Sequence, residues 1–432
     1  MDEPEVSFKQ QLAALATCLV VFIAVYYLAG WYACGSDSVS SFIFPFEKYI
    51  PFLPWMVVPY MSSGLLFAAV FFTAKRKDEL VLLFKRMIFI TVVSGICFIL
   101  FPLRYSFQRP PVSSPVLNFF FGFLNTWDNS FNQAPSLHIS YACLFWSVLS
   151  DKLHGYRKIF AGIWIFLMGI STLTVYQHHL IDIITSLMLV CITFFLFPGP
   201  APRNSRIAMI YFFIAVSVIL LILLFYPQIP VLFLLVWPAV TLAGVGRAYL
   251  HTDSGFLKRS DGTIGFISGI LYFPYIAVYG AVRHFLCRKT TLMVTGIYPG
   301  VFIGPMPDCR IVQEMKVDRS WKIIDLTAEL EECKILRTGA DYFSFPMLDI
   351  ATVKEEDMDR LLDLITRIYV ALKPEEKIYI HCMMGHSRSV FAGAMFIKHQ
   401  LKTDMPEAFA CIKSGPRYDI LKLKNTDEYR NV

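Results

Sequence analysis

Long segments without Asp, Glu, Lys or Arg fill most of the chain before residue 250, and they constrain its fold more than any other feature. A helix that crosses a bilayer needs about 20 mostly apolar residues, because lipid offers its backbone no hydrogen-bonding partner. The last segment has the length of two crossings and is interrupted at Tyr226–Pro230, so we predict eight spanning helices. The segments are residues 12–34, 53–74, 87–103, 137–150, 159–177, 180–197 and 207–246, of which only 180–197 contains a residue of these types, Asp182.

A further apolar stretch, residues 262–282, contains Pro274 and several glycines and tyrosines. A ninth crossing here would move everything after it to the other side of the membrane. Pro and Gly are poor residues for the interior of a helix. We therefore predict that this stretch lies in the membrane interface or re-enters without crossing.

The loops between the apolar segments indicate their orientation, because cytoplasmic loops carry the excess of Lys and Arg. With the N-terminus inside, the inner loops hold thirteen such residues and the outer loops hold three, namely Lys48, Arg104 and Arg109. We therefore predict an inner N-terminus and an inner C-terminal region.

The composition changes near residue 290. The whole chain is 56% hydrophobic and 17% charged, against a usual charged share of about 25%, but charged residues crowd together after residue 300. We predict a membrane domain at 1–200, an additional hairpin and linker at 201–289, and a soluble domain at 290–432. The net charge of +6 is distributed over short clusters, which argues against nucleic-acid binding.

The ten cysteines are scattered, with no CxxC pair and no spacing typical of a metal site. The sequence therefore predicts no disulfide framework, no bound metal and no other cofactor.

The soluble region alternates short strands with amphipathic helices. Residues Lys322–Leu326 and Lys377–His381 have the pattern of buried strands, and Glu355–Leu372 has apolar residues at helical spacing. Such alternation predicts an α/β domain with a mainly parallel sheet.

Residues 381–389 read His-Cys-Met-Met-Gly-His-Ser-Arg-Ser and follow a predicted strand. A loop between Cys382 and Arg388 at a helix N-terminus can point its backbone N–H groups inward and bind an anion, and Arg388 can add a bidentate fork. The same positive surroundings favour the thiolate of Cys382, which can attack phosphorus. Gly385 permits the tight turn, and Ser389 can donate a hydrogen bond to the sulfur.

This motif is similar to the signature of the protein-tyrosine-phosphatase superfamily, and residues 296–421 resemble its compact dual-specificity branch. The resemblance implies that Cys382 forms a thiophosphate intermediate and that Asp349 protonates the leaving oxygen. It also implies that Gly385 and Ser387 belong to the phosphate-binding loop. The substrate would be a phosphoprotein or a phospholipid head group.

Polar residues also gather at the predicted outer ends of the spans, where they are costly unless they serve a function. A His four residues before an Asp places both on one helical face, where the carboxylate can orient the imidazole. His178 and Asp182 have this spacing, and His179 faces Asp182 as well. Ser136 and His138 precede another span.

This pattern resembles the type 2 phosphatidic acid phosphatase (PAP2) superfamily over residues 50–200. The resemblance implies that His178 is the nucleophile, Asp182 its orienting partner and His138 the general acid. The phosphate ligands that it implies are Arg104, Arg109 and Ser136.

Two positions depart from the PAP2 pattern, since Pro102 stands where the first motif has Lys and Thr172 where the third motif has Arg. Relatives similar to sphingolipid synthases also lack that arginine. Three interpretations therefore stay open: lipid-phosphate hydrolysis, head-group transfer, and a catalytically inactive lipid-binding bundle that localises the cysteine phosphatase. The domain order is similar to that of bacterial PAP2/dual-specificity phosphatase fusions of the inner membrane, which implies a periplasmic PAP2-like site and a cytoplasmic cysteine-phosphatase domain.

Overall fold

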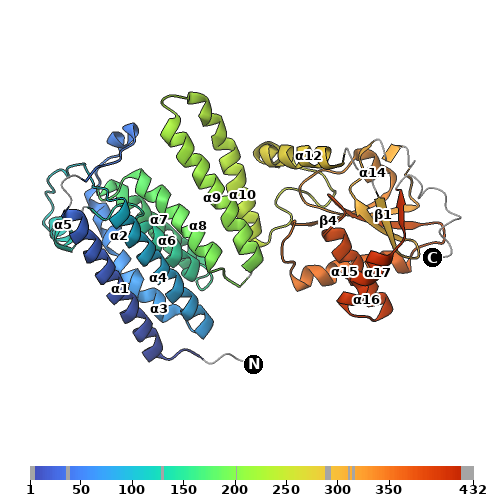
Figure 1. Cartoon of the computed structure of the whole chain (residues 1–432), viewed down its shortest axis with the longest axis horizontal. Helices are drawn as coiled ribbons and strands as arrows, with labels where there is room; N and C mark the ends of the chain where they lie inside the picture. Colours follow the sequence, from blue (N-terminus) through green and yellow to red (C-terminus); the bar gives the residue numbers. More distant parts are fainter. Residues whose placement is uncertain are drawn as a thin grey trace. The chain divides into compact units, whose positions relative to one another are not determined.

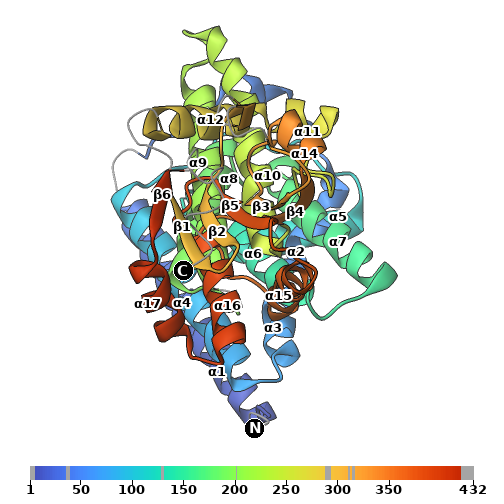
Figure 2. The same cartoon turned by 90° about the vertical axis from the view of Figure 1, so that its right-hand side faces the viewer.

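The computed structural model describes residues 5–35, 39–127, 131–200, 202–287, 293–309, 312–313 and 317–419. The chain forms two units, Met1–Val236 and Trp237–Val432, which we call the N-terminal and the C-terminal unit. Each is described by itself (Figures 1 and 2).

The N-terminal unit is a bundle of helices (Figure 1). Helix α6 is central to it, because it contacts α3, α4, α7 and α8, while α1 packs on α4 and α8 on α9. The buried core includes Phe71, Met87, Leu144, Phe145 and Met168. The helices are α1 (Phe8–Cys34), α2 (Val57–Met61), α3 (Ser63–Thr73), α4 (Lys77–Leu100), α5 (Pro115–Trp127), α6 (Leu137–Leu149), α7 (Gly155–Thr174), α8 (Leu180–Leu196) and α9 (Pro202–Phe225), with 3-10 turns η1 (Pro45–Tyr49), η2 (Pro54–Met56) and η3 (Pro230–Leu235).

Several helices are long and apolar enough to cross a membrane. Among the residues that the structure describes, six meet that criterion, and two further apolar helices, α6 and α8, are shorter. Large apolar side chains such as Leu65 and Phe166 are exposed on the bundle surface, as expected where lipid replaces water as the solvent. Helix α9 ends at Phe225, at the interruption that the sequence predicts. These features are compatible with membrane association, while the number of crossings stays a prediction.

The C-terminal unit contains a six-stranded sheet of order β4-β3-β5-β2-β1-β6. Strands β2, β3, β4 and β5 are parallel, and β1 pairs antiparallel with β2 and β6. The predicted strands and helix coincide with β3, β5 and α15, so the α/β prediction is confirmed. The strands are β1 (Met293–Tyr298), β2 (Val301–Pro305), β3 (Trp321–Thr327), β4 (Asp341–Met347), β5 (Lys377–Cys382) and β6 (Arg417–Asp419); the helices are α10 (Val236–His251), α11 (Phe266–Leu271), α12 (Phe273–Cys287), α14 (Lys334–Gly339), α15 (Glu355–Val370), α16 (Arg388–Leu401) and α17 (Met405–Ser414).

Both faces of this sheet are covered, which explains why β3 and β5 are apolar throughout. On one face Ile324 and Ile380 pack in a core with Leu361 of α15 and Phe396 of α16. On the other face Ile323 and Tyr379 pack with Leu336 of α14 and Trp321. The three helices α15, α16 and α17 lie together beside the strands (Figure 1).

Two observations refine the sequence predictions. The stretch 262–282 forms two short helices, α11 with 6 and α12 with 15 residues, and each is shorter than the roughly 20 residues that a crossing needs. The scattered cysteines gave no indication of a bonded pair, whereas the structure bonds Cys309 to Cys333. They follow β2 and β3, respectively, and the cysteine spacing could not reveal that these two loops meet.

Candidate active site

The central parallel strand β5 places Cys382 at its carboxyl end, and helix α16 begins six residues later at Arg388. The turn between them directs backbone groups at the sulfur. The Gly385 N–H donates to Cys382 Sγ at 3.3 Å, and Ser389 Oγ lies 3.4 Å from the same sulfur. Cys382 is buried. The helix N-terminus and the inward N–H together form an environment that favours negative charge.

Gly385 is required by the shape of this loop. Its φ of +74° lies in the left-handed region, which L residues other than Gly rarely adopt. A Cβ there would also lie 2.6 Å from Pro305 N and 2.7 Å from Gly304 C, both backbone atoms of β2. The loop therefore passes too close to the neighbouring strand for any side chain at this position.

Arg388 is held from one end of its guanidinium. Its Nη1 donates to Glu329 Oε2 at 2.8 Å and to the carbonyl oxygen of Met347 at 2.8 Å. Its buried Nε makes no hydrogen bond with a described residue and lies 3.4 Å from Asp349 Oδ1. Burial would lower the pKa of Arg388, but Glu329 and then Asp349 hold it above its ordinary value. The Nε–H remains a donor available to an anion in the loop.

Asp349 lies beside the same loop. Ser387 Oγ donates to Asp349 Oδ1 at 3.3 Å, and the Ile350 N–H donates to it at 3.1 Å. The Asp349 carbonyl oxygen accepts a hydrogen bond from Tyr249 Oη of α10 at 2.9 Å. The structure thus brings together Cys382, Gly385, Ser387, Arg388, Ser389 and Asp349.

A buried charged cluster that the sequence did not predict lies behind the loop. Lys258 Nζ donates to Asp325 Oδ2 and to the Thr327 carbonyl oxygen, and Tyr342 Oη donates to the same carboxylate at 2.6 Å. The side chains of Lys258 and Asp325 have no exposed area. Lys258 comes from the predicted linker, where sequence reasoning counted it only as a loop charge.

His381, which precedes the cysteine, completes this cluster. Its Nδ1 lies 3.8 Å from Asp325 Oδ1, and its Nε2 lies 3.2 Å from Glu332 Oε2. Burial lowers the pKa of His381 to about 4, and burial and then the charge of Asp325 raise the pKa of Glu332 to about 8. Asp325, Glu332 and His381 offer ligand atoms within 4.8 Å of one another. Lys258 already supplies a positive charge to Asp325.

The sequence-predicted histidine cluster of the N-terminal unit is also assembled. His178 Nδ1 lies 3.1 Å from Asp182 Oδ2, and the rings of His138 and His178 are 6.1 Å apart between centroids. Ser136 is buried at the start of α6, and its N–H donates to the Asp182 carbonyl oxygen. His179 instead pairs with Glu47 Oε2 at 2.9 Å. Sequence reasoning missed Glu47, an isolated acid in a loop.

The two predicted phosphate-binding arginines have other surroundings. Arg109 Nη1 donates to Asn125 Oδ1 at 2.7 Å, and its guanidinium lies over the ring of Phe121. Arg104 is exposed, and its backbone N–H donates to the Ser40 carbonyl oxygen. The structure therefore brings His138, His178, Asp182 and Ser136 together.

Comparison with known proteins shows similarity over part of the chain. No family model matches the chain. Over 113 residues the chain is 29% identical to tyrosine phosphatase 067L of Invertebrate iridescent virus 3, covering 26% of this chain and 47% of the viral protein. The chain therefore spans about half the length of this curated relative. This match supports a protein-tyrosine-phosphatase-superfamily region.

Two solved structures are also similar to part of the chain. A mutant form of Tk-PTP is 21% identical, covers 32% of this chain and 88% of its own, and has a TM-score of 0.25. The human tyrosine phosphatase-like serine/threonine/tyrosine-interacting protein is 16% identical, covers 31% of this chain and 95% of its own, and has a TM-score of 0.23.

Proposed function

We propose that the protein is a membrane-anchored phosphatase whose C-terminal unit hydrolyses phosphate monoesters through Cys382. The observation that carries this proposal is the arrangement around one loop of Cys382 Sγ, the Gly385 N–H and Arg388 Nε, which makes no hydrogen bond with a described residue. A phosphoprotein is the substrate class that the tyrosine phosphatase match favours.

In the first step the Cys382 thiolate attacks phosphorus, the bond from phosphorus to the leaving oxygen breaks, and Asp349 gives that oxygen its proton. In the second step water attacks phosphorus, the S–P bond breaks, and Asp349 takes the proton from water. Loop N–H groups and Arg388 hold the equatorial oxygens where charge develops. Ser389 donates a hydrogen bond to the sulfur as it leaves.

Kinetics with two aryl phosphates test these roles in the purified full-length protein. Cys382→Ser should abolish hydrolysis of both, while the exposed Cys411→Ser should leave it unchanged. Asp349→Asn should slow phenyl phosphate far more than 4-nitrophenyl phosphate, because the second leaving group needs little protonation. An equal loss on both substrates would show that Asp349 is not the acid.

We propose a lipid-phosphate site at the histidine cluster as a second function. The His178–Asp182 pair and the adjacent His138 favour it: His178 would form a phosphohistidine, and His138 would protonate the leaving alcohol. In a Cys382→Ser background, phosphate release from phosphatidic acid should disappear on His178→Ala and persist on His154→Ala, which alters an exposed histidine.

Release that survives His178→Ala, or no release from any lipid phosphate, would leave the N-terminal unit as a lipid-binding anchor. A labelled alcohol acceptor in the same assay distinguishes head-group transfer from hydrolysis.

We also propose that the histidine cluster faces the periplasm and the C-terminal unit the cytoplasm of a bacterial inner membrane. A reporter fused after Val432 that works only in the periplasm would contradict this topology.

A further inference from the structure

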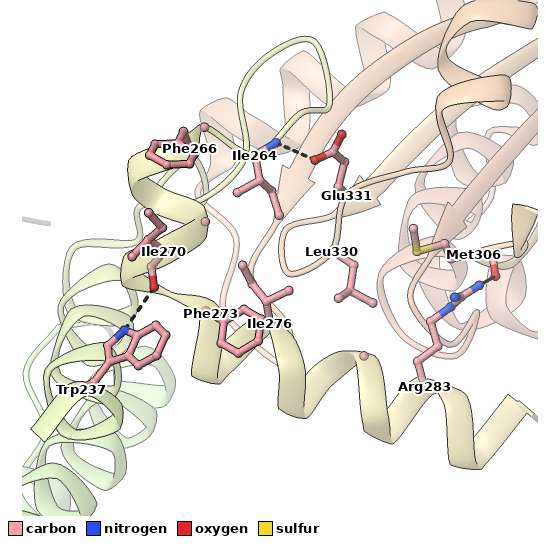
Figure 3. A pocket seen from close by; sticks show the side chains of 13 residues that line it. Trp237, Ile264, Phe266, Ile270, Phe273, Ile276, Arg283, Met306, Leu330 and Glu331 are labelled. Atoms are coloured by element: carbon pink, nitrogen blue, oxygen red, sulfur yellow. Dashed lines mark hydrogen bonds between the residues drawn. The ribbon is translucent and has the colours of Figure 1, made fainter. Parts of the chain in front are cut away.

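A cavity of about 750 Å³ lies in the C-terminal unit, bordered by α10, α11 and α12 and by the loops that follow β2 and β3. We call it the trough. Figure 3 shows Trp237, Phe266 and Ile270 at one end of it and Arg283 and Met306 at the other. Phe273, Ile276 and Leu330 line it between these ends. Its volume falls within the range of about 300–1,000 Å³ that ligand sites occupy.

The trough continues into an exposed apolar surface on α11 and α12. Phe266 is 81% exposed, Ile267 80% and Phe273 54%. Contiguous exposed apolar side chains of this size are unfavourable in water and mark contact with a membrane or a partner. Aromatic residues such as Trp237 and Tyr272 are typical of membrane interfaces. The surroundings therefore favour a lipid over a water-soluble ligand.

One guanidinium nitrogen lacks a hydrogen-bond partner among the described residues at the end of the trough that lies beside the catalytic loop. Arg283 Nη2 donates to the Met306 carbonyl oxygen at 2.8 Å, but its buried Nε has no hydrogen-bond partner among the described residues. The Met306 N–H in turn donates to the Cys382 carbonyl oxygen at 2.7 Å. Glu331, also at the trough, is paired with Arg337 at 2.6 Å. Arg283 thus offers a buried donor with positive charge to an anion.

We propose that the trough binds an acyl chain of an anionic phospholipid, with the lipid phosphate at Arg283. The apolar wall suits the acyl chain. The Arg283 Nε–H, which has no hydrogen-bond partner among the described residues, suits the negatively charged phosphate. The lipid is either a substrate of the Cys382 site or a non-reacting anchor. The substrate alternative rests on the proposed function, whereas binding itself does not.

Photolabelling of the full-length Cys382→Ser protein in phosphatidylcholine nanodiscs tests binding. The probe is phosphatidic acid with a diazirine in one acyl chain. Labelled peptides should include residues 264–276 and Leu330. Gly280 lines the trough, and a Cβ there meets nothing within 4 Å, so Gly280→Leu should fill the trough and reduce this labelling about tenfold. The exposed Val278→Leu is the matched control, and labelling of α1 by surrounding lipid should stay constant in every variant.

Arg283→Gln should reduce labelling by the phosphatidic acid probe to the level of a phosphatidylcholine probe with the same chain. The proposal would be overturned if Gly280→Leu left the labelling of residues 264–276 unchanged. It would also be overturned if labelling were confined to the N-terminal helices. An unlabelled trough together with a dimer in native mass spectrometry would assign it to a second copy of the chain, which also overturns it.

Activity of the protein with Cys382 intact shows whether the bound lipid is a substrate or a non-reacting anchor. A higher KM for phosphatidic acid and an unchanged KM for phenyl phosphate in Gly280→Leu would identify a bound substrate. Loss of labelling with both KM values unchanged would identify a bound anchor. If the protein hydrolyses neither compound, the proposed function fails while the labelling result still decides whether the trough binds lipid.

Discussion

Replacing Lys258 by Met should destabilise the C-terminal unit strongly, although Lys258 lies in the predicted linker. The substitution keeps much of the side-chain volume and removes the positive charge. Asp325, which has no exposed area, then loses its Lys258 counter-ion and keeps, among the described residues, hydrogen bonds from Tyr342 and the Thr327 N–H and the neighbouring His381 at 3.8 Å. A buried carboxylate without a cation must take up a proton or remain desolvated, and both cost free energy.

The expected loss is about 3–5 kcal/mol, the usual cost of removing one partner of a buried ion pair. An exposed pair provides the comparison: Arg367 and Asp363 are 3.0 Å apart with side chains 70% and 64% exposed, and such pairs contribute about 0.3–0.5 kcal/mol. Arg367→Met should therefore change stability roughly tenfold less than Lys258→Met.

Hydrogen exchange of the β3 and β5 amides in the full-length protein measures this difference locally. Each 1.4 kcal/mol corresponds to about a factor of ten, so Lys258→Met should speed exchange by about a hundredfold or more and Arg367→Met by about twofold. Adding Asp325→Asn to Lys258→Met should recover a large part of the protection. If Lys258→Met behaves like Arg367→Met, the buried counter-ion argument is wrong; if Asp325→Asn gives no recovery, the loss comes from packing and not from charge.

Three further substitutions have defined outcomes. Glu332→Gln should stabilise the C-terminal unit more at pH 8 than at pH 5 in the same exchange experiment. The raised pKa of about 8 makes the native carboxyl keep a proton that the unfolded chain loses above 4.5, so the wild type alone loses stability over this range, by about 3 kcal/mol. Arg388→Lys should lower kcat for phenyl phosphate by about a hundredfold or more, because a single ammonium cannot replace the guanidinium that holds Glu329 and faces the loop. An unchanged kcat with a raised KM would count against this role. Gly385→Ala should abolish phosphate release, since its Cβ would strike the backbone of Pro305, and wild-type rates would refute the assigned loop geometry.

The part of the site that could be predicted is the part that is local in sequence. Strand β5, Cys382, the tight turn and the start of α16 occupy consecutive residues, so their geometry follows from one motif. Asp349 was found only because the resemblance carries its position. Glu329 contacts Arg388, Glu332 contacts His381 and Lys258 contacts Asp325. Each of these contacts comes from another element, and it depends on which loops meet at the carboxyl edge of the sheet. No spacing in the sequence contains that information.

The membrane region was predictable in a different way. Composition and length located the apolar helices, and a break at Tyr226–Pro230 located the end of α9. Composition and length could not show that Glu47 as well as Asp182 contacts the neighbouring histidines His178 and His179. Glu47 is an isolated acid in a loop, 132 residues from His179 in the chain. Composition and length also gave no indication that the stretch 262–282 divides at Tyr272 into α11 and α12 and lines a cavity.

Strand β6 has consequences for how the protein behaves at high concentration. It comprises only Arg417–Asp419, yet it pairs antiparallel with β1 along one edge of the sheet. A chain ending before Arg417 would leave the outer backbone N–H and C=O groups of β1 without partners. An open edge of this kind is a template for the strands of neighbouring molecules. Three residues near the end of the described chain therefore protect the phosphatase region from self-association, and their removal should produce aggregates before it produces an unfolded protein.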